Sequence, residues 1–210
     1  MSIVEPTVLI VPGLRDHVDA HWQTLLAREL EARGRPVRSV PPMGREDLDC
    51  ARRVEAIDRA LAAIPEPPIV VAHSGGVIMF AHWARTHDRP IRGALLATPP
   101  DFEQPMPEGY PTIDALRAGG WLPVPRKLLP FPSIVTGSRN DPLGSIERVA
   151  ELAHSWGSRF DDLGAVGHLN PASGFGAWAQ APAYVAELVA LRPRAAQILT
   201  RCAQRAPSHY

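Results

Sequence analysis

A serine near the middle of the chain stands where a nucleophile could be held, in the stretch Ala72-His73-Ser74-Gly75-Gly76 that follows a run typical of a buried strand. A nucleophilic serine needs a sharp turn from strand into helix, with small residues two positions before and after it, because strand and helix approach closely there. Ala72, at a position where glycine is more usual, and Gly76 meet that requirement. The pattern predicts a nucleophile elbow at Ser74. The alternative is a serine that only caps a helix.

A serine hydroxyl is a poor nucleophile without a histidine base that a carboxylate orients. On an elbow of this kind the acid and then the histidine follow the serine along the chain. Of the eight histidines, His168 fits this order, because it lies in a loop directly after the last predicted strand and can reach back over the carboxyl edge of the sheet. The other seven precede Ser74, lie in predicted helices or stand at the end of the chain. His168 is the predicted base, and an ordinary surface histidine is the alternative.

The predicted acid is Asp141, which follows another predicted strand at the same edge of the sheet. Pro142 favours an extended backbone at Asp141, which would hold the carboxylate steady. Its alternative role is to cap the helix that begins near residue 145. Asp161 and Asp162 compete for the role, but they lie within or at the end of a strand only a few residues from His168.

Two backbone N–H groups are the expected oxyanion donors. The Gly75 N–H would lie at the start of a helix, where the partial positive charge of the helix stabilises an anion. The second donor is expected in the loop after the first strand, where Gly13 lets the backbone approach a ligand and Leu14 offers its N–H. An ordinary turn glycine is the alternative for Gly13.

The elements that must position these residues alternate along the chain as short apolar runs and longer runs with helical spacing. Strands are expected at residues 7–11, 36–40, 68–72, 91–98, 132–136 and 159–163, and helices at 22–33, 47–64, 76–86, 145–156 and 177–191. This alternation indicates strand–helix–strand units with right-handed connections. The predicted fold is α/β, with a mostly parallel, doubly wound sheet and helices on both of its faces.

Residues 99–132 interrupt this rhythm with nine prolines in 34 residues, a density that excludes a long helix. Long irregular segments inside a compact domain are usually functional or disordered. One interpretation is a solvated loop, and the other is an ordered cap over the site, which the apolar side chains of the segment favour. We expect Trp121 of this segment, together with His73 and Gly13, to contact the substrate.

The length of 210 residues fits a single domain, with residues 192–210 as a C-terminal extension. Apolar residues at 45% and charged residues at 21% are typical of a globular protein. The 22 basic residues balance 22 acidic ones, which argues against nucleic acid or an anionic membrane as the main partner. The first residues show no signal peptide, and no apolar run is long enough to span a bilayer, so the expected compartment is the cytoplasm.

No metal or other cofactor is expected from the residue pattern. The two cysteines, Cys50 and Cys202, are too few for a thiolate metal site. No histidine pair has the spacing and flanking glutamate of a helical zinc site, and the chain has no phosphate-binding glycine loop.

These motifs resemble the RBBP9/YdeN family of small serine hydrolases, within the α/β-hydrolase superfamily. The resemblance runs from Val8 to about Leu188, and its motifs are Val11-Pro12-Gly13, the elbow at Ser74, Asn140-Asp141-Pro142, and Gly167-His168-Leu169-Asn170 leading into Ser173-Gly174-Phe175-Gly176. It implies a compact α/β-hydrolase, a Ser74–Asp141–His168 triad, no metal, and esterase-like activity on small acyl esters.

The sequence therefore predicts a carboxylesterase-like serine hydrolase that forms an acyl-enzyme and acts on a small-molecule acyl substrate. One alternative is a binding protein that keeps a hydrolase fold without catalysis. Another is a thioesterase or peptidase with the same triad, because the same catalytic groups serve every acyl transfer. The acceptor and the shape of the pocket decide between these chemistries, and both are expected to depend on residues 99–132.

Overall fold

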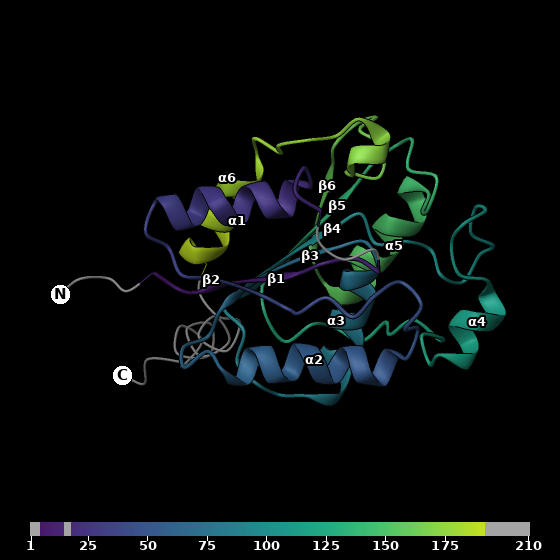
Figure 1. The fold of residues 1–210 in the computed structure, drawn as a ribbon, viewed down its shortest axis with the longest axis horizontal. Helices are drawn as coiled ribbons and strands as arrows, with labels where there is room; N and C mark the ends of the chain where they lie inside the picture. The colour runs from purple at the N-terminus through teal and green to yellow at the C-terminus, as the bar shows by residue number, and fades with distance from the viewer. Residues whose placement is uncertain (1–4, 15–17, 192–210) are drawn as a thin grey trace, which may run out of the picture.

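The computed structural model describes residues 5–14 and 18–191, and within them six parallel strands form one sheet (Figure 1). The strands are β1 (Val8–Val11), β2 (Val37–Ser39), β3 (Ile69–His73), β4 (Gly93–Ala97), β5 (Ser133–Gly137) and β6 (Arg159–Asp162). Their order across the sheet is β2-β1-β3-β4-β5-β6. The helices are α1 (Trp22–Ala32), α2 (Cys50–Ala62), α3 (Gly75–Thr86), α4 (Ile113–Ala118), α5 (Ile146–Trp156) and α6 (Ala181–Ala190), with a 3-10 helix η1 at Pro171–Ser173. The predicted parallel, doubly wound α/β sheet is confirmed.

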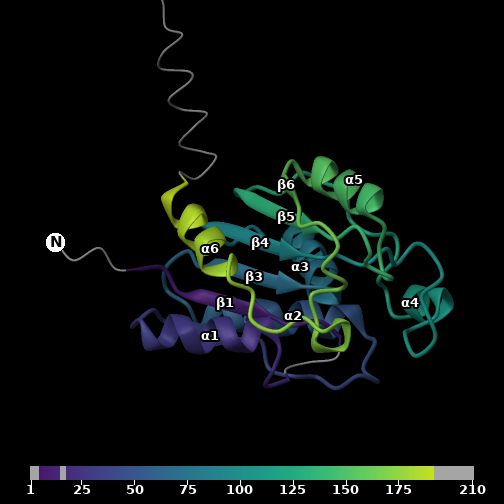
Figure 2. The same ribbon diagram turned by 90° about the horizontal axis from the view of Figure 1, so that it is seen from above.

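Helices cover both faces of the sheet (Figure 2). Helices α1 and α6 pack against one face, and α2, α3 and α5 pack against the other. The strands are apolar along their length because both of their sides are covered. In β1, for example, Leu9 and Val11 join one buried cluster while Val8 and Ile10 join the cluster on the opposite face.

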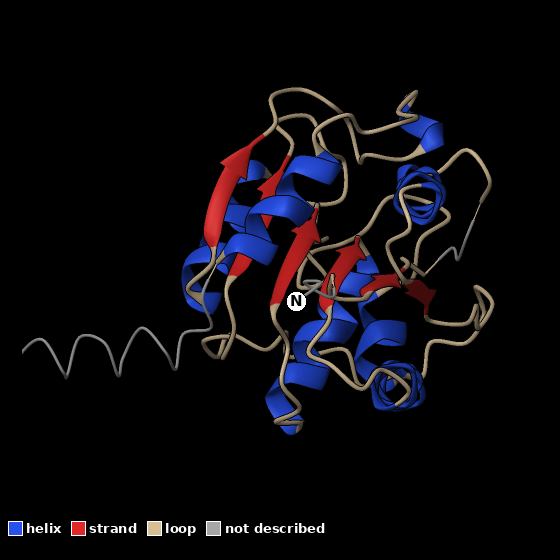
Figure 3. Ribbon diagram, turned by 90° about the vertical axis from the view of Figure 1, so that its left-hand side faces the viewer, coloured by secondary structure: helices blue, strands red, loops and turns tan. Residues whose placement is uncertain are grey.

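Figure 3 shows the strands side by side, with helices on both sides of the sheet. Strands β1 and β3 are neighbours in the middle of the strand order, with β2 on one side of them and β4, β5 and β6 on the other. The two strands end side by side, with Val11 opposite Ala72. From these ends the chain diverges, because α1 packs on one face of the sheet and α3 on the other. A crevice opens at such a switch point beyond the carboxyl ends of the strands, and ligands of open α/β sheets bind there. The fold thus places Gly13 and Ser74 at one crevice.

Helix α3 begins in close contact with the loop that follows β1. A Cβ atom on Gly76 would lie 2.5 Å from the carbonyl oxygen of Pro12 and 2.6 Å from that of Val11. Both neighbours are backbone atoms, so no side chain fits at this position without moving the main chain. Gly76 therefore permits the close approach that the turn from β3 into α3 requires.

Residues 99–132 contain one short helix and several buried side chains. Helix α4 starts after Thr112, whose hydroxyl oxygen accepts a hydrogen bond from the Ala115 N–H. Beyond α4, Trp121, Leu129 and Phe131 are buried in the cluster on the α2 and α3 face. The two ends of the segment are therefore packed into the domain, whereas residues 103–120 are exposed or half-buried apart from Leu116.

None of the helices in the described ranges has the length and hydropathy needed to cross a membrane. The expected C-terminal extension, residues 192–210, lies outside the described residues.

Gly76→Ala is expected to lower the free energy of unfolding by about 1–3 kcal/mol, because the added methyl group must displace backbone atoms. Gly176→Ala is the matched control, since nothing lies within 4 Å of a Cβ there; its effect should not exceed about 1 kcal/mol. Urea unfolding followed by circular dichroism measures both values. Equal effects of the two substitutions would contradict the close contact.

Candidate active site

Ser74 occupies the turn between β3 and α3 with φ at 55° and ψ at −132°. A positive φ is unfavourable for a residue with a side chain and persists only where the surrounding structure imposes it. The Ser74 N–H donates a hydrogen bond of 2.9 Å to the Ala97 carbonyl, which helps to fix the turn. The Ser74 hydroxyl makes no capping bond to α3, whereas Ser145 caps α5 by accepting from the Arg148 N–H. The turn leaves the Ser74 hydroxyl available at the crevice.

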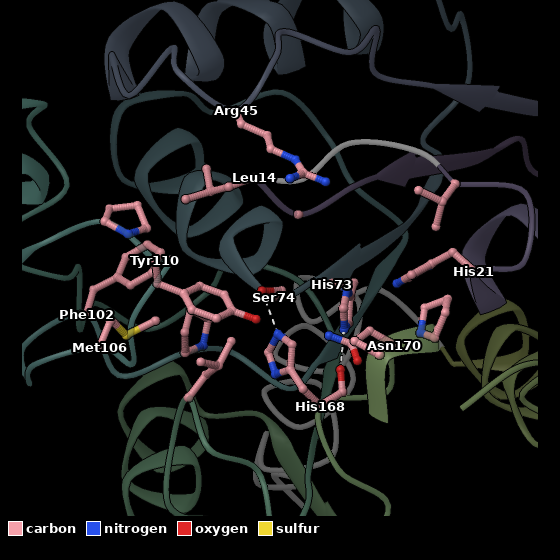
Figure 4. Close-up of a pocket in the computed structure, with 18 of the residues that line it drawn as sticks. Leu14, His21, Arg45, His73, Ser74, Phe102, Met106, Tyr110, His168 and Asn170 are labelled. Atoms are coloured by element: carbon pink, nitrogen blue, oxygen red, sulfur yellow. Dashed lines mark hydrogen bonds between the residues drawn. The ribbon is translucent and has the colours of Figure 1, made fainter. Parts of the chain in front are cut away.

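Ser74, His168 and Asp141 are joined in one chain of hydrogen bonds. Ser74 Oγ lies 2.8 Å from His168 Nε2 (Figure 4), and His168 Nδ1 lies 2.8 Å from Asp141 Oδ2. The side chains of His168 and Asp141 are only 5% and 1% exposed. Because a carboxylate accepts hydrogen bonds, Nδ1 of His168 carries the hydrogen, and Nε2 is left to accept from the Ser74 hydroxyl. The structure thus brings together the three residues that the sequence singled out.

Two loops hold Asp141 and His168 in register. The Asn140 side-chain oxygen accepts a hydrogen bond of 2.7 Å from the Gly167 N–H. The residue before Asp141 is thus bonded to the residue before His168. Within its own loop, Asp141 Oδ1 accepts from the Leu143 N–H at 2.9 Å. Asp141 does not cap α5, because that position belongs to Ser145. The carboxylate is therefore fixed on one oxygen by its own loop and on the other by His168.

His73 supports His168 through a hydrogen bond to its main chain. His73 Nε2–H donates to the His168 carbonyl oxygen at 2.9 Å. The His73 ring lies 4.7 Å from the ring of His21 and 5.0 Å from that of His168. Burial, and then the neighbouring His168 and His21, hold the pKa of His73 well below its usual range. His73 was expected to contact the substrate; it borders the pocket, but its donor is already used on His168.

Gly13, Leu14 and Gly75, the residues expected to form the oxyanion site, lie close together. A Cβ on Gly13 would lie 3.2 Å from Ser74 Cβ and 3.5 Å from its Oγ. A Cβ on Gly75 would lie 2.8 Å from Cγ of Leu14. Gly75 is the first residue of α3, so its N–H has no acceptor within the helix. The three residues named for the oxyanion side thus lie together beside Ser74.

A pocket of about 520 Å³ opens over Ser74 and His168. One of its walls is apolar and includes Phe102, Met106 and Leu143. In Figure 4, Phe102 and Met106 lie on one side of Ser74, while His21 and Asn170 lie on the other. The pocket is large enough for a small acyl group and its leaving group.

Trp121 does not line this pocket, and the expectation that it contacts substrate is wrong. The Trp121 side chain is fully buried, and its indole N–H donates to the Leu48 carbonyl at 2.8 Å. A large ring with one polar atom is stable in the core once that atom has a partner. Phe102 packs edge-to-face on Trp121 and, with Tyr110, provides the aromatic lining of the pocket instead.

Neither cysteine nor metal chemistry gains support from the described residues. Burial raises the pKa of the Cys50 thiol to about 12, so this thiol stays protonated at neutral pH. Cys202 lies outside the described residues. Within the described ranges, no three histidine, cysteine, aspartate or glutamate side chains gather in a way that could hold a metal ion.

The loop between β2 and α2, from which Arg45, Glu46 and Leu48 line the pocket, carries no motif that marks it in the sequence. Nor does the sequence predict the role of Asn140 in tying two loops together. The usable signal was topological: loops at the carboxyl ends of parallel strands meet at one edge of the sheet. The loop after the second predicted strand belongs to that edge.

The chain is similar to known hydrolases over most of its length. The model of a family described as serine hydrolase matches residues 8–187. A solved protein described as a YdeN-like hydrolase, from Pectobacterium atrosepticum, is 29% identical, with 88% of this chain and 91% of that chain covered and a TM-score of 0.72. The ydeN gene product of B. subtilis is 15% identical, with 89% and 100% covered and a TM-score of 0.72.

More distant solved structures share the fold alone. A thioesterase domain from the curacin biosynthetic pathway is 15% identical, with 88% of this chain and 91% of that chain covered and a TM-score of 0.59. A search of curated proteins finds no match.

The lowered pKa of His73 predicts a loss of stability in acid. The folded protein keeps His73 neutral while the unfolded chain takes up a proton below about pH 6.5. The free energy of unfolding should therefore fall below that pH, by up to about 1.4 kcal/mol per pH unit from this group. His73→Gln keeps an amide donor but does not titrate, so its stability should fall less steeply with acid. Urea unfolding between pH 7.5 and 5 measures this, and equal slopes for both proteins would contradict the assignment.

Proposed function

Because the chain belongs to the serine hydrolase family, and its resemblance to YdeN-like hydrolases of the α/β-hydrolase superfamily is confirmed, we propose that it hydrolyses carboxylic esters through an acyl-enzyme on Ser74. The observation that carries this proposal is the hydrogen-bonded chain from Ser74 through His168 to Asp141, set on a strained turn beside a pocket. A serine, a histidine base and an orienting carboxylate in this order are the working parts of acyl transfer.

In the first half-reaction, Ser74 Oγ attacks the acyl carbon while His168 Nε2 accepts the hydroxyl proton. Asp141 keeps Nδ1–H of His168 oriented and stabilises the imidazolium that forms. The backbone N–H groups of Leu14 and Gly75 bind the oxyanion of the tetrahedral intermediate. The imidazolium then gives its proton to the departing alcohol, and the acyl group stays on Ser74.

In the second half-reaction, water takes the place of the alcohol. His168 Nε2 accepts a proton from the water as its oxygen attacks the acyl carbon. The same two N–H groups bind the second oxyanion. Collapse of this intermediate breaks the bond to Ser74 Oγ, which recovers the proton from His168, and the carboxylic acid leaves.

The shape of the pocket supports a small or medium acyl group as substrate. Its apolar wall, with Phe102 and Met106, offers contact to a hydrocarbon chain. Figure 4 shows Tyr110 on the same side, with its hydroxyl directed toward Ser74 and His168. We assign the hydrocarbon part of the acyl chain to this wall.

Ester hydrolysis by Ser74→Ala and by His168→Ala should show a kcat lower by 10³-fold or more, because each variant removes a part on which the others depend. Ser145→Ala is the matched control: it removes a helix-capping serine, so it should lower stability by about 1 kcal/mol and keep kcat. Release of 4-nitrophenol from short-chain 4-nitrophenyl esters measures kcat. A folded wild-type protein without turnover would favour the alternative of a binding protein without catalysis.

Met106→Trp should narrow the apolar wall and lower kcat/KM for octanoyl esters relative to acetyl esters by about tenfold. Leu128→Trp is the matched control, because Leu128 belongs to the same proline-rich segment, is 64% exposed, and does not line the pocket. The ratio of kcat/KM between the two esters is the measurement. An unchanged ratio in Met106→Trp would place the acyl chain elsewhere.

A further inference from the structure

A single cationic side chain faces the pocket among the described residues that line it, and it is Arg45. None of the ion pairs between described residues involves Arg45; the neighbouring pairs belong to Arg35 and Arg52. Figure 4 shows the Arg45 side chain reaching toward the pocket on the side where Leu14 lies. Arg45 is an exposed residue at the rim of the pocket that holds Ser74, and its guanidinium donors are directed toward that pocket.

Other arginines of the fold form ion pairs with acidic side chains. Arg148 is bonded to both Asp101 and Glu103, and Arg139 is paired with Asp162 at 2.8 Å. A guanidinium group carries five N–H donors in a planar fork that matches a carboxylate. At Arg45 this fork faces a cavity, and no acid of the described residues is paired with it.

The loop that carries Arg45 is held in place by a buried arginine. Arg53 of α2 is 2% exposed, and it donates from Nη2 to the Gly44 carbonyl at 2.6 Å and from Nε to the Asp47 carbonyl at 2.8 Å. Arg52 forms a further ion pair with Asp47 at 3.1 Å. Arg45 therefore stands between two anchored residues, and its backbone is positioned before any ligand arrives. Such preorganisation lowers the cost of binding.

The neighbouring Glu46 limits which anion suits the site, because it also lines the pocket. Repulsion from a carboxylate grows with the charge of the ligand, so a dianionic phosphate is disfavoured more than a monoanion. A carboxylate carries one negative charge and fits the guanidinium fork with two parallel hydrogen bonds.

We propose that the ester cleaved at Ser74 carries a second functional group, a free carboxylate on its acyl chain, and that Arg45 binds it. This inference rests on the proposed function, because it concerns the substrate of the same site. The preferred substrates are monoesters of dicarboxylic acids, in which the ester carbonyl lies at Ser74 and the far carboxylate reaches Arg45.

The test compares esters that differ only in the terminal carboxylate. Monoethyl adipate is paired with ethyl hexanoate, and monoethyl suberate with ethyl octanoate, and acid release is followed by titration. The wild-type protein should show a kcat/KM at least tenfold higher for the carboxylated member of one pair. In Arg45→Gln this ratio should fall about tenfold, mainly through KM, and Arg45→Lys should recover part of it.

The matched control is Arg38→Gln, which removes the same charge from β2, away from the pocket wall, and should keep the wild-type ratio. Glu46→Gln should raise the ratio, because it removes an opposing charge. Equal rates on both members of each pair, or the same loss in Arg38→Gln as in Arg45→Gln, would overturn the carboxylate proposal. Failure of the proposed function looks different, since then none of the four esters is hydrolysed.

Discussion

The close packing of the first turn of α3 against the loop after β1 is the constraint on which the site depends. Gly76 lies so near the carbonyl groups of Val11 and Pro12 that only a hydrogen atom fits there. Gly13 in turn approaches Ser74 from the same loop. With both sides fixed, the chain can leave β3 only through a sharp turn, and Ser74 takes a positive φ that a free chain would avoid. The strain is offset by packing in the rest of the domain, and its consequence is a hydroxyl that faces the crevice.

Hydrogen bonds between loops at the carboxyl edge of the sheet position His168 and Asp141 relative to Ser74. The Asn140 side chain links the loop after β5 to the loop after β6 through the Gly167 N–H. The His73 ring donates a hydrogen bond to the His168 carbonyl oxygen. Buried polar groups that are hydrogen-bonded, as His73 and His168 are, favour one arrangement, because a displacement would leave a donor or acceptor without a partner. The catalytic geometry that we propose is therefore a property of the scaffold, while the specificity depends on the more exposed loops around the pocket.

The parts of the site that the sequence could predict are those with a local signal. A buried strand followed by small residues around a serine marks the elbow, and the loops that follow parallel strands gather at one edge, which brings His168 and Asp141 within reach. The orientation of Trp121 could not be predicted, because an apolar side chain in this segment could line the pocket or lie in the core. Only the tertiary packing decides between the two. Helix α4 spans six residues, too few to show a helical period between prolines. Arg45 lies in a loop, where no hydrophobic periodicity indicates which way a side chain points.

The proposed mechanism requires that the Ser74 hydroxyl is chemically activated. Intact-mass analysis after incubation with a fluorophosphonate probe, which labels serines made nucleophilic by a base, answers this for the wild-type protein beside Ser74→Ala and Ser145→Ala. We expect one adduct on the wild-type protein and on Ser145→Ala, and none on Ser74→Ala. A folded wild-type protein that takes up no probe, or an adduct that persists in Ser74→Ala, would contradict the mechanism.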